Sequence, residues 1–322
     1  MRQYQIRENE AGQRLDKYLK KLLNQAPGSF LYKMLRKKNI VLNEKKADGG
    51  EKLNVGDTVT LFLSQETIEK FQRPMKAEGD PFVKYPVANL EILYESKDFL
   101  VINKPAGMLS QKAKPDDISA NEYIIGYLLD TKAITREELA TFTPSVVNRL
   151  DRNTSGILAA GKTMKGLQQM SHMLKQRELG KYYGCLAVGE IRKEQTLTDW
   201  LKKDEGTNRV VVTKEAEEGS VPIRTILHPQ KIISGFTLLN VQLITGRSHQ
   251  IRAHLASLGH PIVGDPKYGN PDVNRRFRES CHIHSQLLYA CQMELPDQTV
   301  INAPLPKSFQ RAITEIQRKE MV

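Results

Sequence analysis

The sequence reads Asn148-Arg149-Leu150-Asp151-Arg152-Asn153-Thr154-Ser155-Gly156 between two short apolar runs, residues 145–147 and 157–160. The runs are typical of two strands joined by a polar loop, in which Thr154-Ser155-Gly156 supplies turn chemistry. The loop carries one carboxylate, Asp151, between two guanidiniums. These nine residues leave two interpretations open. One is an ordinary hairpin with a surface ion pair; the other is a carboxylate held for chemistry, since loops on rigid scaffolds carry most catalytic residues.

The chain has 322 residues, a length that predicts roughly two domains. It contains no run of about 18 apolar residues, and its first residues are polar, so we expect neither a membrane span nor a secretory signal. The cysteines Cys185, Cys281 and Cys291 are too few for a disulfide framework and form no CxxC pair. We therefore expect a cytoplasmic protein.

Prolines at positions 74, 81 and 86 interrupt a stretch of mixed charge. We expect a linker over residues 65–89, a first domain over residues 1–64 and a second over residues 90–322. The formal net charge is +11, and residues 1–64 hold 13 Lys and Arg against 7 Asp and Glu. Over half of the positive excess therefore lies in a fifth of the chain. This concentration indicates a polyanionic partner, most simply nucleic acid.

The first domain has a helix–helix–strand–strand pattern. Apolar residues recur at helical spacing over residues 15–23, and Ser29 is a candidate N-cap for a second helix. Residues 40–43 and 55–62 are patterned as strands. The helices carry a basic face, which is either a solvated surface or a contact to RNA phosphates. The candidate RNA-binding residues are Arg14, Lys17, Lys33, Arg36, Lys37 and Lys38.

Residues 12–64 resemble an S4 RNA-binding domain. The similarity is carried by the phrase Arg14-Leu15-Asp16-Lys17-Tyr18-Leu19, the basic second helix, a strand that ends in Asn43 and a closing strand at Gly56-Asp57. The resemblance implies that this domain binds RNA.

Many short strands and two or three helices are expected in the second domain, without a βαβ rhythm. We predict helices near residues 119–129, 164–176 and 248–258, the last with Ser248 as N-cap. The strands are expected at residues 90–95, 99–103, 181–188, 210–212, 223–227 and 236–243. This pattern predicts an α+β fold around a mixed, mainly antiparallel sheet.

The densest cationic cluster is Gly246-Arg247-Ser248-His249-Gln250-Ile251-Arg252-Ala253-His254-Leu255, followed by a glycine-punctuated loop over residues 259–269. Its arginines and histidines favour an anion-binding or nucleotide-binding site. We expect no metal site, because neither this pair of histidines nor the strand-like His282-Ile283-His284 has the companions of a zinc site. The GxxxxGK[ST], GxGxxG and GxSxG motifs are also absent.

Four segments in order resemble the RluA-type pseudouridine synthases, most closely the RluC/RluD branch, which carries an S4 domain and modifies large-subunit (23S) ribosomal RNA. They are Asn103-Lys104-Pro105-Ala106-Gly107, Arg149-Leu150-Asp151 with Thr154-Ser155-Gly156, Lys181-Tyr182-Tyr183, and the cationic cluster with the loop that follows it. The resemblance covers about residues 90–305. It implies RNA as partner, a pseudouridine synthase fold, and a reaction that detaches uracil, turns it and rejoins it through carbon without a cofactor.

The resemblance implies that Asp151, Tyr183 and Arg252 are catalytic. Asp151 would act as nucleophile or base, Tyr183 would stack on the uracil, and Arg252, ahead of Arg247, would keep the carboxylate ionised. The expected substrate-binding residues are Arg149, Arg247, His249, Gln250 and Lys104; Lys104 and Lys267 would contact phosphates or support the pocket. The target base would have to flip out of its stack to reach Asp151.

The family usually has His before Arg-Leu-Asp, where this chain has Asn148. Asn can donate and accept hydrogen bonds but cannot titrate near neutral pH, so we expect it to be a structural substitute. Two alternatives to the synthase remain: a non-catalytic RNA-binding or ribosome assembly factor on the same fold, and a base hydrolase that releases uracil. Monomer is the default expectation.

Overall fold

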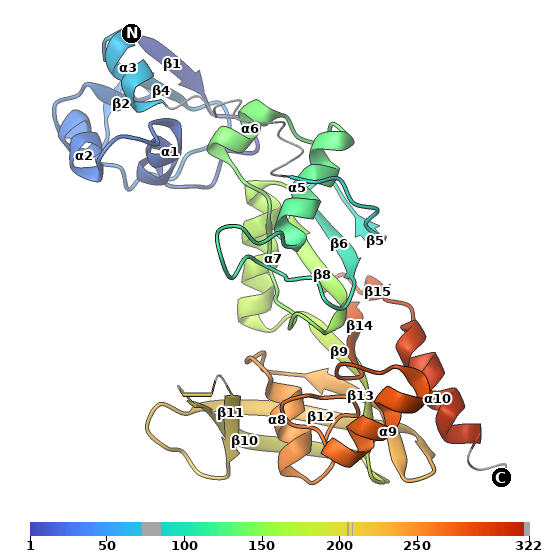
Figure 1. The fold of residues 1–322 in the computed structure, drawn as a ribbon. Helices are drawn as coiled ribbons and strands as arrows, with labels where there is room; N and C mark the ends of the chain where they lie inside the picture. Colours follow the sequence, from blue (N-terminus) through green and yellow to red (C-terminus); the bar gives the residue numbers. More distant parts are fainter. Residues whose placement is uncertain (73–84, 205, 208, 319–322) are drawn as a thin grey trace.

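A computed structural model describes residues 1–72, 85–204, 206–207 and 209–318. It is elongated, with a small N-terminal unit at one end and a large second sheet that runs through the rest of the molecule (Figure 1). The small sheet has the strand order β1-β4-β2-β3, and the large sheet has eleven strands. Within these residues no helix is both long and apolar enough to cross a membrane.

The N-terminal unit packs helices on its small sheet around one apolar core. Its elements are β1 (Arg2–Gln5), α1 (Leu15–Leu22), α2 (Gly28–Arg36), β2 (Ile40–Leu42), β3 (Lys45–Lys46), β4 (Thr58–Leu61) and α3 (Gln65–Phe71). The predicted helical stripe of α1 is buried through Leu15, Tyr18 and Leu19. The N-cap of α2 is Pro27 and not Ser29, because the Pro27 carbonyl accepts the first helical hydrogen bonds, from Phe30 and Leu31.

Helix α3 occupies the start of the segment that the sequence marked as a linker. Its N-cap Ser64 accepts a hydrogen bond from the Thr67 amide, and Ile68 is buried in the N-terminal core. The prolines Pro74 and Pro81, on which the linker prediction rested, lie outside the described residues.

The large sheet is mainly antiparallel, as the α+β prediction required. Its path is β11-β10-β12-β13-β9-β14-β8-β6-β5, with β15 beside β14 and β7 beside β8. Only the β14–β8 pair is parallel among the described strand pairs. The strands are β5 (Ile92–Glu95), β6 (Phe99–Lys104), β7 (Ser145–Val146), β8 (Ser155–Gly161), β9 (Gly180–Val188), β10 (Gln195–Asp204), β11 (Arg209–Thr213), β12 (Val221–Ile233), β13 (Phe236–Leu243), β14 (Leu288–Glu294) and β15 (Val300–Asn302).

The helices of this second unit outnumber the two or three that were predicted. They are α5 (Ala120–Asp130), α6 (Arg136–Thr141), α7 (Met164–Gln176), α8 (Gln250–Ser257), α9 (Pro271–Cys281) and α10 (Lys307–Arg318). Helix α6 begins with a capping box between Thr135 and Glu138, in a stretch for which no helix was predicted. His282 ends α9 in the left-handed conformation, with φ 56°, so the predicted strand at His282–His284 is wrong.

The middle of the large sheet brings the two halves of this unit together. Ala290 of β14 pairs with Gly156 of β8 on one side and with Tyr183 of β9 on the other. Gly156 has φ +104°, and a Cβ atom there would lie 2.7 Å from the Ala290 nitrogen. Only glycine fits this approach, which sets the exit of the polar loop 148–156 directly beside the strand that carries Tyr183.

The N-terminal unit contacts α6 and α7 through polar groups. The Thr141 hydroxyl donates to Glu10 at 2.6 Å, the Asn9 amide donates to Glu138 at 2.9 Å, and the Gln168 amide donates to the Gly12 carbonyl at 2.8 Å. These bonds orient the small unit relative to the large sheet.

Candidate active site

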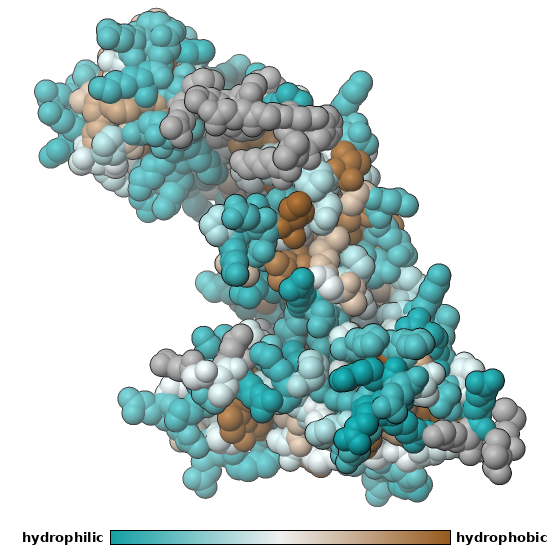
Figure 2. Space-filling model, viewed as in Figure 1, coloured by the Kyte–Doolittle hydropathy of each residue, from teal (hydrophilic) through white to brown (hydrophobic). Residues whose placement is uncertain are grey.

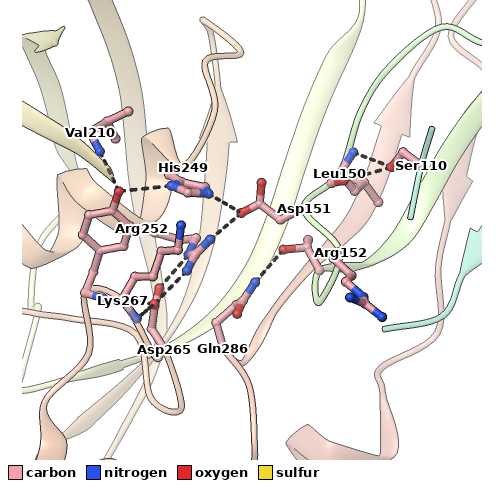
Figure 3. A network of polar contacts seen from close by, with 12 residues as sticks. Ser110, Leu150, Asp151, Arg152, Val210, His249, Arg252, Asp265, Lys267 and Gln286 are labelled. Atoms are coloured by element: carbon pink, nitrogen blue, oxygen red, sulfur yellow. Dashed lines mark hydrogen bonds and ion pairs between the residues drawn. The ribbon is translucent and has the colours of Figure 1, made fainter. Parts of the chain in front are cut away.

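Asp151 lies in the loop between β7 and β8, and its carboxylate faces α8 (Figure 3). Arg252 Nη1 donates to Asp151 Oδ2 at 2.7 Å. The Thr154 amide donates to the Asp151 carbonyl at 3.0 Å and closes the turn. The side chain of Asp151 stays 27% exposed, whereas that of Arg252 is 5% exposed. The carboxylate can therefore meet a substrate while its counter-cation is held inside the protein.

The backbone around Asp151 is held from several sides. The Ser110 hydroxyl donates to the Leu150 carbonyl at 2.9 Å and accepts from the Leu150 amide at 3.0 Å. Gln286 donates to the Thr154 hydroxyl at 3.2 Å (Figure 3). These bonds fix the loop in position before any substrate arrives, which lowers the entropic cost of aligning the carboxylate.

Lys104 holds the backbone of the same loop through hydrogen bonds from inside the protein. Its buried ammonium donates to the carbonyls of Pro105, Met108 and Arg152 at 2.8–3.1 Å. Burial lowers the pKa of Lys104 to about 8, although the nearby Asp151 charge opposes the shift. Of the two roles that the sequence suggested, support of the pocket fits this geometry, and contact with a phosphate does not, because the ammonium is enclosed.

Arg252 is shared by two carboxylates. Its Nε and Nη2 donate to Asp265 at 2.7 and 2.8 Å in a bidentate pair, while Nη1 remains for Asp151. Burial alone would raise the pKa of Asp265, but the Arg252 guanidinium and the amides of Lys267 and Tyr268 bring it below its usual value. Burial also works against the charge on Arg252, and the two carboxylates more than offset it, so its pKa is raised.

His249 sits on the other side of the Asp151 carboxylate, with Nε2 3.9 Å from Oδ2. Its Nδ1 lies 3.1 Å from the Tyr268 hydroxyl, which also accepts from the Val210 amide at 2.8 Å. Burial lowers the pKa of His249, and the attraction of Asp151 only partly compensates. When Tyr268 donates its proton to Nδ1, the neutral ring presents Nε2–H to Asp151.

The left-handed backbone at His249, with φ 56°, precedes α8 and corrects the predicted N-cap. Gln250 Oε1 accepts from the Arg247 amide at 3.1 Å and so braces the turn that leads into α8. Gln250 is itself buried and bonds Thr225, Thr245 and the Arg224 carbonyl. It therefore builds the turn and does not present its amide to a substrate, contrary to expectation.

Tyr183 is buried on β9, and the Asp151 charge acts on its hydroxyl. Burial raises the pKa of Tyr183 above its usual value, with a smaller contribution from Asp151. The phenol therefore stays protonated near neutral pH. Arg149 and Arg247 are exposed, and neither forms an ion pair with Asp151 among the contacts of the described residues. Of the two predicted counter-cations, the structure brings Arg252 to Asp151.

Asn148 ties the start of the polar loop to β8. Its amide donates to the Ile157 carbonyl at 3.2 Å and accepts from the Ala159 amide at 2.8 Å. Both hydrogen-bonding groups of the side chain are thus used on backbone, which fits the structural substitution that was expected at this position.

Asp265 and Tyr268 were missed as individual site residues. Both lie in the predicted glycine-punctuated loop, and a lone carboxylate thirteen residues from a buried arginine gave no signal of pairing. Among the residues that the structure describes, no group of three His, Cys, Asp or Glu side chains could hold a metal. The predicted RNA-binding residues of α1 and α2 lie far from this site, exposed on the N-terminal unit (Figure 1).

Comparisons with known proteins bear on this arrangement. A family model described as RNA pseudouridylate synthase matches residues 98–257. Ribosomal large subunit pseudouridine synthase C of Vibrio vulnificus is 30% identical over 323 residues, which cover 97% of this chain and 95% of the relative. The chain belongs to the RNA pseudouridylate synthase family. Ribosomal large subunit pseudouridine synthase C of Escherichia coli K12 is 27% identical over 318 residues, which cover 97% of this chain and 95% of the relative.

Solved pseudouridylate synthase structures share the fold. Human RNA Pseudouridylate Synthase Domain Containing 4 matches with a TM-score of 0.58 and 18% identity, covering 70% of this chain and 93% of that one. Human RNA Pseudouridylate Synthase Domain Containing 1 matches with a TM-score of 0.53 and 22% identity, covering 75% and 89%. The large sheet and its helices are therefore a pseudouridylate synthase fold, as the sequence predicted.

Proposed function

We propose that this chain converts uridine to pseudouridine in large-subunit ribosomal RNA. The observation that carries the proposal is the Asp151 carboxylate, 2.7 Å from a buried arginine and still open to solvent. The relatives named above as ribosomal large subunit synthases support the choice of RNA. The reaction breaks the bond from the ribose to the uracil nitrogen and forms one to carbon; the proton on that carbon is lost, and the freed nitrogen gains one.

In this proposal Asp151 attacks the sugar or the ring, or removes a proton to form an elimination intermediate. Arg252 orients the carboxylate, and Asp265 holds Arg252. Tyr183 stacks on the uracil; its protonated phenol suits stacking and hydrogen-bond donation better than proton removal. His249 lies close enough to Asp151 to contact the same base.

A stacked uridine cannot reach Asp151, so the base flips out at a cost of a few kcal/mol. Arg149 and Arg247 are exposed beside the loop and the start of α8. We assign them to the RNA backbone or to the space that the base vacates. The N-terminal unit, which we extend from residue 1 through α3 because Ile68 belongs to its core, holds the RNA through exposed cations of α1 and α2.

We also propose that the protein works as a cytoplasmic monomer. The proposal of a monomer is supported by Asp151, Arg252 and Tyr183, which meet within one chain.

The test is Asp151→Asn, with Asp130→Asn as the matched control, since Asp130 is an exposed carboxylate at the end of α5. Full-length protein is incubated with an unmodified large-subunit ribosomal RNA transcript that carries tritium at uridine C5. We expect Asp151→Asn to lower tritium release by on the order of 10⁴-fold or more, with RNA binding retained, and Asp130→Asn to match the wild type.

Undiminished pseudouridine formation by Asp151→Asn would remove Asp151 from the mechanism. Free uracil in place of an isomerised nucleotide of unchanged mass would indicate a base hydrolase. Bound RNA without either product from the wild-type protein would favour an assembly factor.

A further inference from the structure

Lys181 lies near the start of β9, two residues before Tyr183. Alternate residues of a strand face the same side of a sheet, so Lys181 and Tyr183 share the face on which Asp151 acts. Their Cα atoms are separated by roughly 7 Å along the strand. Lys181 therefore lies one strand repeat from Tyr183, and its ammonium adjoins Gly246 at the turn before α8.

Lys181 is a partly buried cation without an acidic partner. Among the ion pairs of the described residues, none involves Lys181. The nearest strand carboxylate, Glu294, pairs across from Gly180 and accepts a hydrogen bond from Tyr182, so it lies on the opposite face of the sheet. A buried, unpaired charge is costly, which makes a purely structural role for this ammonium unfavourable.

The charged group that acts on Lys181 is also a cation. Burial lowers the pKa of Lys181, and the charge of Arg177 lowers it further. Arg177 is exposed at the left-handed C-cap of α7, with φ 62°. Arg247 is exposed one residue after Gly246, which adjoins the Lys181 ammonium. Lys181 thus has one cation, Arg177, acting on its charge and a second, Arg247, one residue from the glycine that adjoins its ammonium, and the ion pairs of the described residues give it no carboxylate.

Gly246 keeps the ammonium open to the outside. A Cβ atom at position 246 would lie 3.8 Å from Lys181 Nζ, in van der Waals contact. Any longer side chain there would extend over the ammonium. Glycine leaves room for a group that approaches from the side of Arg247.

We propose that Lys181 and Arg247 form a phosphate subsite that binds one backbone phosphodiester of the RNA next to the flipped uridine. A phosphodiester carries the single negative charge that this cluster lacks, and charge-assisted hydrogen bonds to phosphate are the strong ones. The subsite rests on the proposed function for the identity of its RNA, and on the geometry of β9 and the 244–249 turn for its place.

The test is equilibrium binding of the unmodified large-subunit ribosomal RNA transcript to full-length protein between 50 and 200 mM salt. Lys181→Met removes the charge at nearly constant length, and Lys181→Arg keeps it. Lys231→Met is the control, because Lys231 is exposed on β12, where it pairs with Leu238 at the end of β13 that lies away from the 244–249 turn. Thermal unfolding confirms that each variant is folded.

We expect Lys181→Met to weaken binding roughly tenfold at 50 mM salt and to lower the slope of log affinity against log salt by about 0.7–0.9. Lys181→Arg should recover most of both, and Lys231→Met should change neither. Weakened binding with an unchanged salt slope would show that the ammonium meets a neutral group, such as a uracil carbonyl, and would overturn the phosphate assignment. Unchanged binding by folded Lys181→Met would overturn the subsite altogether.

Binding is measured separately from tritium release, so the two proposals fail in different ways. A wild-type protein that forms no pseudouridine refutes the proposed function, while the salt slope of its Lys181 variants still decides the subsite.

Discussion

Arg252 is the residue on which the geometry of the site depends. Its guanidinium uses one edge for Asp265 and leaves one nitrogen for Asp151, so the position of the Asp151 carboxylate is set through Arg252 by Asp265. A buried cation that loses one carboxylate is strongly destabilised. Asp265 therefore stabilises the fold and orients the site by the same two hydrogen bonds.

Lys104 gives a pH prediction at the residue scale. Its pKa falls from 10.5 in the unfolded chain to about 8 in the folded one. Between these values the unfolded state binds more protons, so the free energy of unfolding rises with pH. At roughly 1.4 kcal/mol per pKa unit, the full gain is about 3 kcal/mol.

The measurement compares wild type with Lys104→Met in denaturant unfolding from pH 7.5 to 10.5. We expect the stability difference between them to grow in favour of wild type as pH rises, because only wild type is relieved of a buried charge. Lys20→Met, which removes an exposed lysine of α1, is the control. A difference that stays constant over this range would contradict the buried, charged state of Lys104 at neutral pH.

At the scale of elements, the contact between β8 and β14 sets the distance from the Asp151 loop to Tyr183. Gly156→Ala would place a Cβ atom against the Ala290 backbone in a left-handed conformation. The conformation alone costs about 1–2 kcal/mol, and the collision adds to it because both partners are backbone. We expect a total loss of at least about 3 kcal/mol and loss of tritium release.

The variant Gly219→Ala separates the cost of the left-handed backbone conformation from the cost of the collision with β14. Gly219 has φ +75°, and a Cβ atom there meets nothing within 4 Å. This variant should show the conformational cost alone, at about 1–2 kcal/mol, with full activity. Equal losses of stability for both variants in thermal unfolding would show that the approach of β14 does not constrain the loop.

The elements recovered from the sequence are those with a strong local signal. The amphipathic stripe of α7 and the alternating strand β13 were predicted within their observed bounds. Helix α9 escaped prediction because its apolar contacts, such as Phe277, are spread among charged residues and depend on packing against α10. Strand β10 was missed because its buried face carries a carboxylate, Asp199, between Leu197 and Leu201, which interrupts the apolar alternation.

From the sequence, the segments that form the candidate site could be predicted, but most of the contacts between them could not. The sequence named Asp151, Tyr183 and Arg252, and the chain folds so that they meet. The sequence pattern could not show which of Arg247 and Arg252 pairs with Asp151, because the left-handed turn at His249 decides which arginine points inward. Nor could it show that Gln250 and Lys104 face the interior, since both roles depend on contacts between distant strands.

At the scale of the whole molecule, over half of the excess positive charge belongs to residues 1–64, which lie at the end of the molecule away from α8 (Figure 1). Figure 2 shows hydrophilic residues gathered over α9 as well. If the N-terminal unit holds RNA through phosphates, its contribution to RNA affinity must depend on salt concentration and on where its cations lie, not only on the net charge of the protein. The exposed end of α2, with Lys33 and Arg36 in its last turn and Lys37 at its C-cap, is the place to test this.

We predict that the triple change of Lys33, Arg36 and Lys37 to Gln weakens binding of large-subunit ribosomal RNA at least tenfold at 50 mM salt. The salt slope should fall by about 2–3, because each lost phosphate contact removes about 0.9. The control changes Lys193, Lys231 and Lys307 to Gln, which removes the same charge from exposed positions of the second unit. If both triple variants lose the same affinity, binding follows overall charge, and α2 has no special part in it.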